Sequence, residues 1–562
     1  MSQPKLKIGL LLDGDFVSSW AYEMLEILRA SSHSEIALVV MPRPQPAAAK
    51  KRIFRKIVDN LDGLGAVVVR RGLDWYYRNL LERKTYGRPS EAIKHSPDIL
   101  RGVPIVHVDP IRTKWSDSLS ESDLVEIRSH KIDVFIRLGF RILRGGILQA
   151  ARYGVWSYHH GDNQVNRGGP AGFWEVMECW PETGAVLQIL TEDLDNGKIL
   201  ARTYSSTNFA SVLDNKRNYF WKTLSLIPRK LGELHRVGPQ EFFKRVNEQN
   251  ADPVLYSRRL YTNPDNFEYL RLLIGKTIEK FQEVRRHRRY LDQWILLFDI
   301  RKSLSSSLWR YKRIVPPPDR FWADPHIIER DGAYYIFIEE LFYKENKGHI
   351  SVIKMEKDGR YSAPEKVLER PYHLSYPFLF EYQGHLYMVP ETAQNKTIEL
   401  YRCVEFPGRW EFVHCLMEGV RAYDATLKFH DGKWWLFANM VEVPGASSWD
   451  ELFLFSAETP LSQNWVPHDM NPIISDCKQA RPAGQFIEYN GNMYRPSQNC
   501  ANKYGFGFNL ARVARWDDAA YVEEIVTRVT PDWSDDIVAT HTFSRCGDLH
   551  VIDAQLRRRR RG

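Results

Sequence analysis

A histidine and an aspartate within residues 154–200 are of the types that move an acyl group onto an amine. That reaction needs one group to hold a developing oxyanion and another to accept the proton of the amine. His159 and Asp195 could fill these roles, since each stands in a loop that follows an apolar run. Sites on open α/β sheets are built from such loops. The segment is therefore a candidate acyl-transfer site, although a single histidine is more often a satisfied or surface residue.

The same segment resembles the catalytic core of the folate-dependent formyltransferases. The match begins at residues 133–143 and runs without a gap from Gly154 to Gly197. The resemblance implies that His159 stabilises the tetrahedral intermediate, that Asp195 takes the amine proton, and that formyl-tetrahydrofolate is the donor cofactor. The resemblance places Gly139, Arg167, Gly168 and Trp174 at the substrate or cofactor, and Asn163 in the loop after the histidine is a further candidate.

The sequence departs from the formyltransferase pattern at two places. The asparagine of the family's catalytic trio falls on Ser157, whose hydroxyl can donate one hydrogen bond but stands on a shorter stem. Losing one oxyanion donor typically lowers the rate about a hundredfold or more. The family's Ser-Leu-Leu-Pro loop after the histidine is replaced by the more polar residues 161–164. The substrate or the acyl donor is therefore expected to differ from those of the family.

The beginning of the chain has the pattern of a βα unit. Residues 7–16 are an apolar strand that runs into a glycine turn, and residues 20–29 carry apolar side chains at helical spacing. Further strands are expected at 36–41, 66–69, 103–108 and 133–138. We predict that residues 1–205 form an α/β domain, an open and mostly parallel sheet flanked by helices.

The character of the sequence changes after this domain. Charged and aromatic residues at helix-like spacing predict a helical connector over residues 206–318, which three consecutive prolines at 316–318 bring to an end. The connector contains the basic run 285–289. Two interpretations of this run stay open, a phosphate-binding group and, more commonly, a solvated helix face.

Five glycine turns divide the rest of the chain into repeats. Each turn introduces aromatic or apolar strand residues, and the glycines are Gly332, Gly384, Gly432, Gly491 and Gly547. Repeats of this length, made of short strands joined at hairpins, are typical of four-stranded propeller blades. We predict a five-bladed, all-β propeller over residues 319–556, in which a strand near Phe321 helps to close the ring.

Charged residues beside these turns are expected to point into the funnel of the propeller, three before a turn and one, Glu391, after it. They are Asp324, Glu391, Asp424 and Arg481. This half resembles the five-bladed furanosidases and arabinanases, where inward carboxylates flank a glycosidic bond. It is still more similar, over residues 373–392, to the propeller of the plant glucosamine inositolphosphorylceramide transferases. The funnel residues are either a catalytic set or a sugar-binding ring, and we favour binding.

The cysteines and the chain's beginning bear on its compartment. The six cysteines have neither paired nor metal-ligand spacing, so we expect reduced thiols and no metal site. No charged-then-apolar leader opens the chain, and the expected compartment is therefore the cytoplasm. No apolar run approaches the length of a membrane span.

The net charge of +8 is concentrated at one end, because five of these charges belong to the arginines 557–561. We interpret residues 557–562 as a basic tail. It makes a weak contact with an anionic membrane or is a solvated chain end. We expect no specific nucleic-acid partner.

Three hypotheses for function follow. In the first, a cytoplasmic formyltransferase acts on the amine of an amino sugar or glycan, nucleotide-linked or lipid-linked, which the propeller recognises. In the second, the propeller is the enzyme, a glycoside hydrolase, and the first domain is a scaffold. In the third, the chain is a glycan-binding protein whose formyltransferase-like domain has degenerated, as Ser157 suggests.

Overall fold

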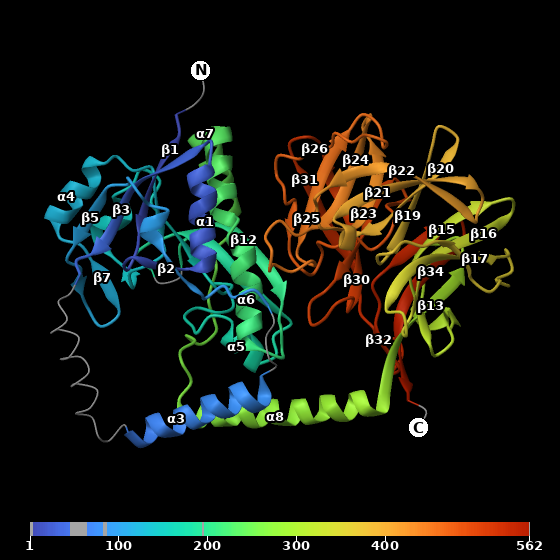
Figure 1. Ribbon diagram of the computed structural model, residues 1–562, viewed down its shortest axis with the longest axis horizontal. Helices are drawn as coiled ribbons and strands as arrows, with labels where there is room; N and C mark the ends of the chain where they lie inside the picture. Colours follow the sequence, from blue (N-terminus) through green and yellow to red (C-terminus); the bar gives the residue numbers. More distant parts are fainter. Residues whose placement is uncertain (1–3, 45–63, 83–86, 194–195, 561–562) are drawn as a thin grey trace. The chain divides into compact units, whose positions relative to one another are not determined.

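The computed structural model describes residues 4–44, 64–82, 87–193 and 196–560. They form two units, one built mainly from residues up to Lys280 and the other mainly from Phe281 onward (Figure 1). Asp195, the predicted catalytic carboxylate, lies outside the described residues. Within the described ranges, no helix is both long enough and apolar enough to cross a membrane.

The first unit is organised around a seven-stranded sheet. In spatial order its strands are β12 (Lys198–Ser206), β11 (Glu182–Ile189), β10 (Val155–His159), β8 (Val134–Arg137), β1 (Leu6–Leu11), β3 (Ser34–Pro42) and β5 (Ile105–Val108). The pairs from β10 through β8, β1 and β3 to β5 are parallel, and β10 pairs with β11 in the antiparallel sense. The predicted mostly parallel sheet is therefore confirmed.

Helices cover both faces of this sheet, which is why β1 is apolar on every side. Leu10 packs into the core under α1 (Ser19–Ala30), and Leu11 packs into a second core under α4 (Glu121–Ser129). Successive strand residues point to opposite faces, so a strand buried on both sides is a continuous apolar run.

One predicted strand of this unit is wrong. Residues 66–69 lie in helix α3 (Leu64–Tyr76), which leads into the π-turn η2 (Tyr77–Leu81). The three valines in this segment favour a strand by themselves. Leu73 and Tyr77, further along, pack with residues of α8 (Asn266–Arg289), and this burial outweighs the local preference.

Short elements complete the chain between these strands and helices. They are β2 (Phe16–Ser18), β4 (Ile93–His95), β6 (Ile111–Arg112), β7 (Ser116–Ser118), β9 (Ile142–Leu143), η3 (Ser96–Asp98), η4 (Gly145–Gln149), α5 (Phe173–Met177), η5 (Leu308–Arg310) and η6 (Ala393–Asn395).

Three helices follow the sheet: α6 (Val212–Thr223), α7 (Leu226–Gln249) and α8. The predicted connector over residues 206–318 is helical only as far as Arg289, because β13 (Tyr290–Ile300) begins directly after α8. The apolar run 295–298 is buried on both faces of this strand, with alternate side chains in two different cores. Burial on two faces removes the alternation that marks a strand in the sequence.

The second unit contains five sheets in sequence order, the blades of a propeller. Blades one to four are β15 (Arg320–Arg330), β16 (Ala333–Phe342), β17 (Lys347–Met355), β18 (Glu365–Leu368); β19 (Ser375–Tyr382), β20 (His385–Thr392), β21 (Thr397–Glu405), β22 (Arg409–Glu418); β23 (Ala422–His430), β24 (Lys433–Met440), β25 (Glu451–Ala457), β26 (Val466–Pro467), β27 (Ile474–Ser475); and β28 (Ile487–Tyr489), β29 (Asn492–Asn499), β30 (Gly507–Trp516), β31 (Tyr521–Val529).

The fifth blade is closed by a strand that precedes the first. β33 (Phe543–Cys546), β34 (Leu549–Arg559), β13 and β14 (Lys312–Ile314) lie side by side, and β32 (Ile537–Ala539) also pairs with β34. β13 therefore closes the ring, and the prediction that a strand near Phe321 does so is wrong.

The predicted basic tail also differs in the structure. Arg557 and Arg558 lie within β34, where Arg557 Nε donates to Asp292 Oδ1 (3.0 Å) and Arg558 donates to the Gln293 amide oxygen. Arg560 N donates to Arg289 O (2.9 Å). These contacts make residues 557–559 the end of a blade strand, since β13 supplies the carboxylate and amide partners that the sequence does not show.

Candidate functional site

Two aspartates, one in blade one and one in blade three, share the same unusual backbone conformation near the start of the blade. Asp324 and Asp424 have φ of 52° and 53°, and each lies seven positions before a hairpin residue, Asp331 or Asp431. The strand register is interrupted at both aspartates. Left-handed φ is uncommon outside glycine, and a bulge of this kind redirects a side chain. Tyr376 holds the same place in blade two, with φ of 44°.

A cavity of about 220 Å³ lies where these strands meet. Its charged lining consists of Asp324, Glu339, His373, Glu391, Arg481 and His541. Its aromatic lining consists of Trp294, Phe321, Tyr423 and Tyr504. We call this cavity the funnel. It draws side chains from all five blades, because Trp294 and His541 come from the closing blade and Tyr504 from the fourth.

Arg481 joins two of the predicted funnel carboxylates. Its Nε donates to Asp424 Oδ2 (2.5 Å) and its Nη2 donates to Glu391 Oε2 (3.2 Å). Gln498 Nε2 donates a further hydrogen bond to Asp424 Oδ2 (2.8 Å). Arg481 is only 6% exposed, so this guanidinium holds both carboxyl groups in a dry environment, where charge interactions are strong.

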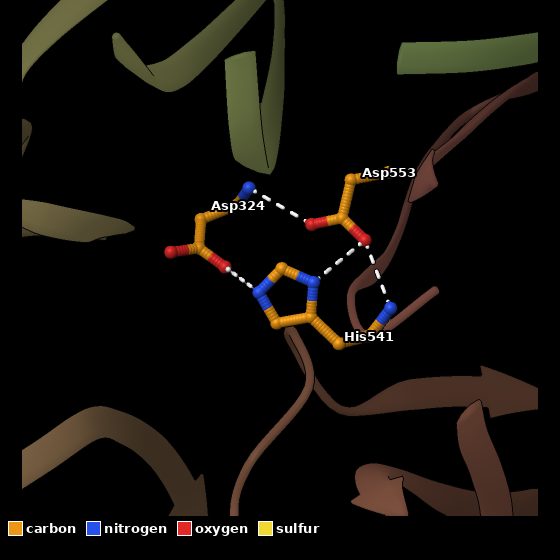
Figure 2. A group of neighbouring side chains, drawn as sticks. All are labelled: Asp324, His541 and Asp553. Atoms are coloured by element: carbon orange, nitrogen blue, oxygen red, sulfur yellow. Dashed lines mark hydrogen bonds and ion pairs between the residues drawn. The ribbon is translucent and has the colours of Figure 1, made fainter. Parts of the chain in front are cut away.

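Asp324, the fourth predicted funnel residue, belongs to a second buried group with His541 and Asp553 (Figure 2). His541 Nε2 lies 3.1 Å from Asp324 Oδ1, and its Nδ1 lies 3.0 Å from Asp553 Oδ1. The second contact is an ion pair without hydrogen-bond geometry. Asp553 also accepts the backbone N–H groups of Asp324, His541 and Thr542.

The ligand atoms of these three residues lie within 4.8 Å of one another, close enough for a metal ion. Their existing partners fit a different role. Asp324 accepts hydrogen bonds from Thr542 Oγ1 (2.9 Å) and Tyr376 N (3.3 Å). Both carboxylate oxygens of Asp553 already accept backbone N–H groups. An imidazolium between two carboxylates already satisfies the group, so its chemistry is that of an ion-pair network that ties the first blade to the last.

The two predicted carboxyl groups of the funnel have opposite proton affinities. Burial by itself raises the pKa of Asp324, but the charge of His541 outweighs it and lowers this pKa to about 2. Burial and the charge of Asp424 raise the pKa of Glu391 to about 8, against the effect of Arg481. At neutral pH the funnel therefore holds an ionised aspartate and a largely protonated glutamate.

The two funnel histidines are cationic. Burial lowers the pKa of His541, but Asp553 and Asp324 outweigh it and raise this pKa to about 10. Burial lowers the pKa of His373, but the carboxylate of Glu339, 3.2 Å away, raises it to about 9. Each imidazolium is thus fixed by an adjacent acid.

The predicted acyl-transfer residues of the first unit have a different environment. His159 Nε2 lies 2.7 Å from Asn166 O, in the loop that follows the strand, and the side chain is only 9% exposed. Ser157 Oγ accepts from Arg137 Nη1 (3.2 Å) and is also buried. The loop carbonyl thus occupies one of the two imidazole nitrogens of His159.

The predicted substrate or cofactor residues of the first unit are separated. Gly139 lines a cavity of about 390 Å³, and Asn163 and Arg167 line another of about 360 Å³. Ser157 and His159 line neither cavity. Because the side chains alternate along β10, His160 and not His159 reaches the first of these cavities.

Two further predicted residues support the fold of this unit. A Cβ atom at Gly168 would stand 2.1 Å from Tyr261 O, so only glycine permits this approach. Trp174 is 1% exposed, and its Nε1 donates to Thr262 O (3.1 Å). Arg167 Nε donates to Asn163 O (2.9 Å). These contacts hold residues 163–174 against residues 261–262.

Several funnel residues were not predicted as site residues. Trp294 and Tyr504 gave no signal, since the first lies before the predicted propeller and the second lies in a loop. Glu339 and Asp553 each follow directly on apolar strand residues, Ile338 and Ile552. A charged residue within an apolar strand is the signal that could have found them, because burial of a charge needs a partner.

Sequence comparison connects the propeller with a named group of transferases. A family model described as "Glucosamine inositolphosphorylceramide transferase 1, N-terminal" matches residues 313–545. The rice (Oryza sativa subsp. japonica) protein named glucosamine inositolphosphorylceramide transferase 1 is 31% identical over 209 residues, which are 37% of this chain and 28% of the rice protein. The chain thus matches less than a third of that relative's length.

Comparison with solved structures gives weaker likenesses. A family 117 glycoside hydrolase from Zobellia galactanivorans is 12% identical with a TM-score of 0.32, covering 47% of this chain and 90% of its own. Glycinamide ribonucleotide transformylase 1 from Symbiobacterium toebii is 17% identical with a TM-score of 0.24, covering 45% of this chain and 92% of its own. Scores this low carry no argument about either unit.

The comparisons overturn the predicted one-carbon transfer. The proteins that match by sequence are named for the transfer of glucosamine to inositolphosphorylceramide, not of a formyl group. The predicted formyltransferase activity is therefore wrong, and the reason for expecting a folate donor falls with it. The Ser157 substitution and the loop carbonyl on His159 agree with this correction.

Proposed function

We propose that this chain takes part in modifying the glycan of a sphingolipid, and that the funnel of its propeller binds one sugar residue. One observation carries the proposal. Of the twelve residues that line the funnel, all except Trp294 lie within residues 313–545, the segment that matches the transferase family model. The likeness to glucosamine transferases therefore covers the cavity itself and not only the framework around it.

The size and lining of the funnel suit a sugar ring. Pockets for drug-sized ligands occupy about 300–1,000 Å³, so a cavity of about 220 Å³ suits a single ring. Carboxylates and an imidazolium offer acceptors and donors for hydroxyl groups. Trp294, Tyr423 and Tyr504 offer aromatic surface for the apolar C–H groups of the ring.

The charges of the funnel favour an amino sugar. Asp324, Glu339 and Glu391 line the cavity, while Asp424 and Asp553 lie directly behind them. Three cationic side chains face these five carboxyl groups. An ammonium group on the ligand would supply positive charge where acids are in excess, and would favour ionisation of Glu391.

Calorimetric titration of the purified full chain with glucosamine, N-acetylglucosamine and glucose tests this proposal. We expect glucosamine to bind, and Asp424→Asn to weaken its binding at least about tenfold by loosening Arg481. The matched control is Asp431→Asn, in the exposed hairpin turn of the same blade. No binding of any of the three sugars by the wild-type chain would remove the sugar-binding role.

The opposed proton affinities of Asp324 and Glu391 support a second candidate, cleavage of a glycosidic bond. A protonated Glu391 could act as general acid and an ionised Asp324 as base or nucleophile, as in the two-carboxylate glycosidases. Release of nitrophenol from a panel of nitrophenyl glycosides tests it. Glu391→Gln should abolish release and Glu381→Gln, an exposed residue of the same blade, should not. Absence of release by the wild-type chain rejects this candidate.

A further inference from the structure

Helix α8 carries an apolar stripe that is exposed along its length. Each helical residue advances by 100°, and six apolar side chains fall within a sector of about 120°. They are Phe267, Leu270, Ile274, Ile278, Phe281 and Val284, with exposed fractions between 43% and 79%. We call them the α8 stripe. Scattered exposed apolar residues are ordinary, but an ordered row over about five turns is not.

A different set of positions anchors the helix. Tyr269, Leu273 and Lys276 are buried, and Thr277 Oγ1 lies 2.9 Å from Tyr76 Oη of the α3 segment. Lys280 Nζ donates to Leu80 O (2.6 Å), so α3 and α8 run side by side in the same direction (Figure 1). The stripe therefore remains exposed although the helix is packed, and packing among residues 4–44, 64–82, 87–193 and 196–560 does not account for its apolar character.

Unpaired arginines accompany the stripe. Arg271, Arg285, Arg288 and Arg289 are exposed, and none of them has a carboxylate partner among residues 4–44, 64–82, 87–193 and 196–560. The C-terminal end of β34 adds exposed Arg559 and Arg560 beside Arg289. We call the arginines at 285–289 and 559–560 the basic cluster. It lies at the C-terminal end of α8, where positive charge is also favoured by the helix dipole.

The three glutamates of the helix do not balance this charge. Glu268 accepts from Arg259 (2.7 Å) and Glu279 accepts from Lys276 (2.8 Å). Glu283 is not free either. Partner helices in coiled coils are selected by complementary charges beside the apolar seam. The groups beside the α8 stripe are arginines, which match a surface of uniformly negative charge better than a second copy of the same helix.

We propose that α8 lies in the surface of an anionic membrane, with the α8 stripe in the boundary between headgroups and acyl chains and the basic cluster against lipid phosphates. An interfacial helix has this division between an apolar face and a cationic surround. Clusters of four to eight basic residues beside such a face bind anionic lipid. The proposal is independent of the funnel, because it rests on α8 and the end of β34 alone.

Flotation of the purified full chain with vesicles tests the proposal. We expect binding to vesicles of phosphatidylcholine with about 30% phosphatidylserine, at least about tenfold weaker binding to phosphatidylcholine alone, and release as salt is raised from about 0.1 to about 0.5 M. Equal binding to both vesicles, or binding to neither, would overturn it.

Two sets of variants separate the stripe from the cluster. Ile278→Glu with Phe281→Glu should lower vesicle binding at least about tenfold, because two apolar anchors are lost and two negative charges added. Phe412→Glu with Val522→Glu, equally exposed apolar positions on outer propeller strands, is the control. Arg285→Gln, Arg288→Gln and Arg289→Gln together should lower binding to anionic vesicles and its salt dependence, whereas Arg409→Gln, Arg512→Gln and Arg515→Gln should not.

Light scattering identifies the competing occupant of the stripe. A monomer with these vesicle properties supports the proposal. A stable dimer that Ile278→Glu with Phe281→Glu dissociates, with no preference for anionic vesicles, would assign the stripe to a second copy of the chain and overturn the membrane assignment. All variants are at exposed positions, and unchanged circular dichroism verifies that they fold.

Discussion

The strand end at Ser157 and His159 and the funnel of the propeller both place imidazole and hydrogen-bonding groups close together. Ser157 and His159 line neither of the two cavities described near them, whereas the funnel residues share one. In the first unit, the carbonyl of Asn166 occupies the ring of His159, and Ser157 is bonded to Arg137. In the second, Asp324, Glu391 and Arg481 line a common space of about 220 Å³. The side chains of a short motif can be used to hold the motif's own loop in place. Side chains from five different blades come together only at the centre of the propeller.

Substitution of Arg481 is expected to have the largest effect on the difference between the two regions. Arg481→Met should lower the free energy of unfolding of the propeller by about 3–5 kcal/mol, because Asp424 and Glu391 would stay buried without their shared cation. Denaturant unfolding followed by hydrogen exchange of propeller peptides measures this loss. Arg481→Lys keeps the charge but not the two-pronged geometry, so its loss should be smaller. A loss under about 1 kcal/mol for Arg481→Met would mean that the cluster is not held as described.

The two regions should respond to pH in opposite directions. Glu391 has a folded pKa of about 8, above its ordinary value, so the folded propeller binds the extra proton and its stability falls as pH rises from about 4.5 to 8. Burial lowers the pKa of His160 in the first unit to about 3, so that unit loses stability as pH falls from about 6.5 to 3.

Unfolding of each unit from pH 3 to 9 measures this contrast. Glu391→Gln should reduce the fall between pH 5 and 8, leaving the contributions of His373 and His541, whose folded pKa values of about 9 and about 10 act from about pH 6.5 upward. His160→Phe, which keeps the stacking on Phe220, should flatten the acid side of the first unit. The same sign of pH dependence in both units would contradict the assignment.

His159 should matter for stability and not for the funnel. His159→Ala removes the contact with Asn166 O and should cost the first unit about 1–2 kcal/mol. Glucosamine binding by the same variant, measured by calorimetry, should equal that of the wild-type chain, in contrast to Asp424→Asn. A large loss of sugar binding in His159→Ala with an intact fold would show that the first unit contributes to the ligand site.

The smallest effect is expected at Ser157. Ser157→Ala removes one hydrogen bond to Arg137, which keeps its bonds to the carbonyls of Phe140 and Arg141. The first unit should lose no more than about 1 kcal/mol in denaturant unfolding, and sugar binding should not change. A loss comparable with that of Arg481→Met would show that the serine is a central part of its site.

Much of the fold could be predicted from the sequence. The glycine turns at 332, 384, 432 and 491 are hairpins in which the glycine and the residue before it both have positive φ, and this demand is visible in the sequence as Asp-Gly, Gln-Gly or Asn-Gly. β13 was missed because its apolar run is buried on both faces and does not alternate. The valines at 67–69 favoured a strand, but packing of α3 on α8 decided for a helix.

The candidate site was predictable only in part. Asp324, Glu391, Asp424 and Arg481 could be identified because each precedes or follows a repeated turn, and the structure gathers all four. Glu339, Tyr504 and Asp553 were not identified, since their partners are up to hundreds of residues away in the chain. Closure of the propeller ring brings together side chains that are far apart in the chain. The spacing of residues in the sequence therefore does not show which of them are in contact.

The sequence by itself determined that this chain has an α/β half and a five-fold repeated β half, because hydrophobic period and turn chemistry are local properties. Only the tertiary structure decided which of the predicted side chains line a common cavity. The burial of His159 beneath its own loop, the pairing of β13 with β34, and the meeting of Asp324, Glu391 and Arg481 at one cavity all depend on contacts between segments that are apart in the sequence. The pKa values of the funnel side chains also depend on the tertiary structure, because burial and neighbouring charges determine them and neither can be derived from the sequence.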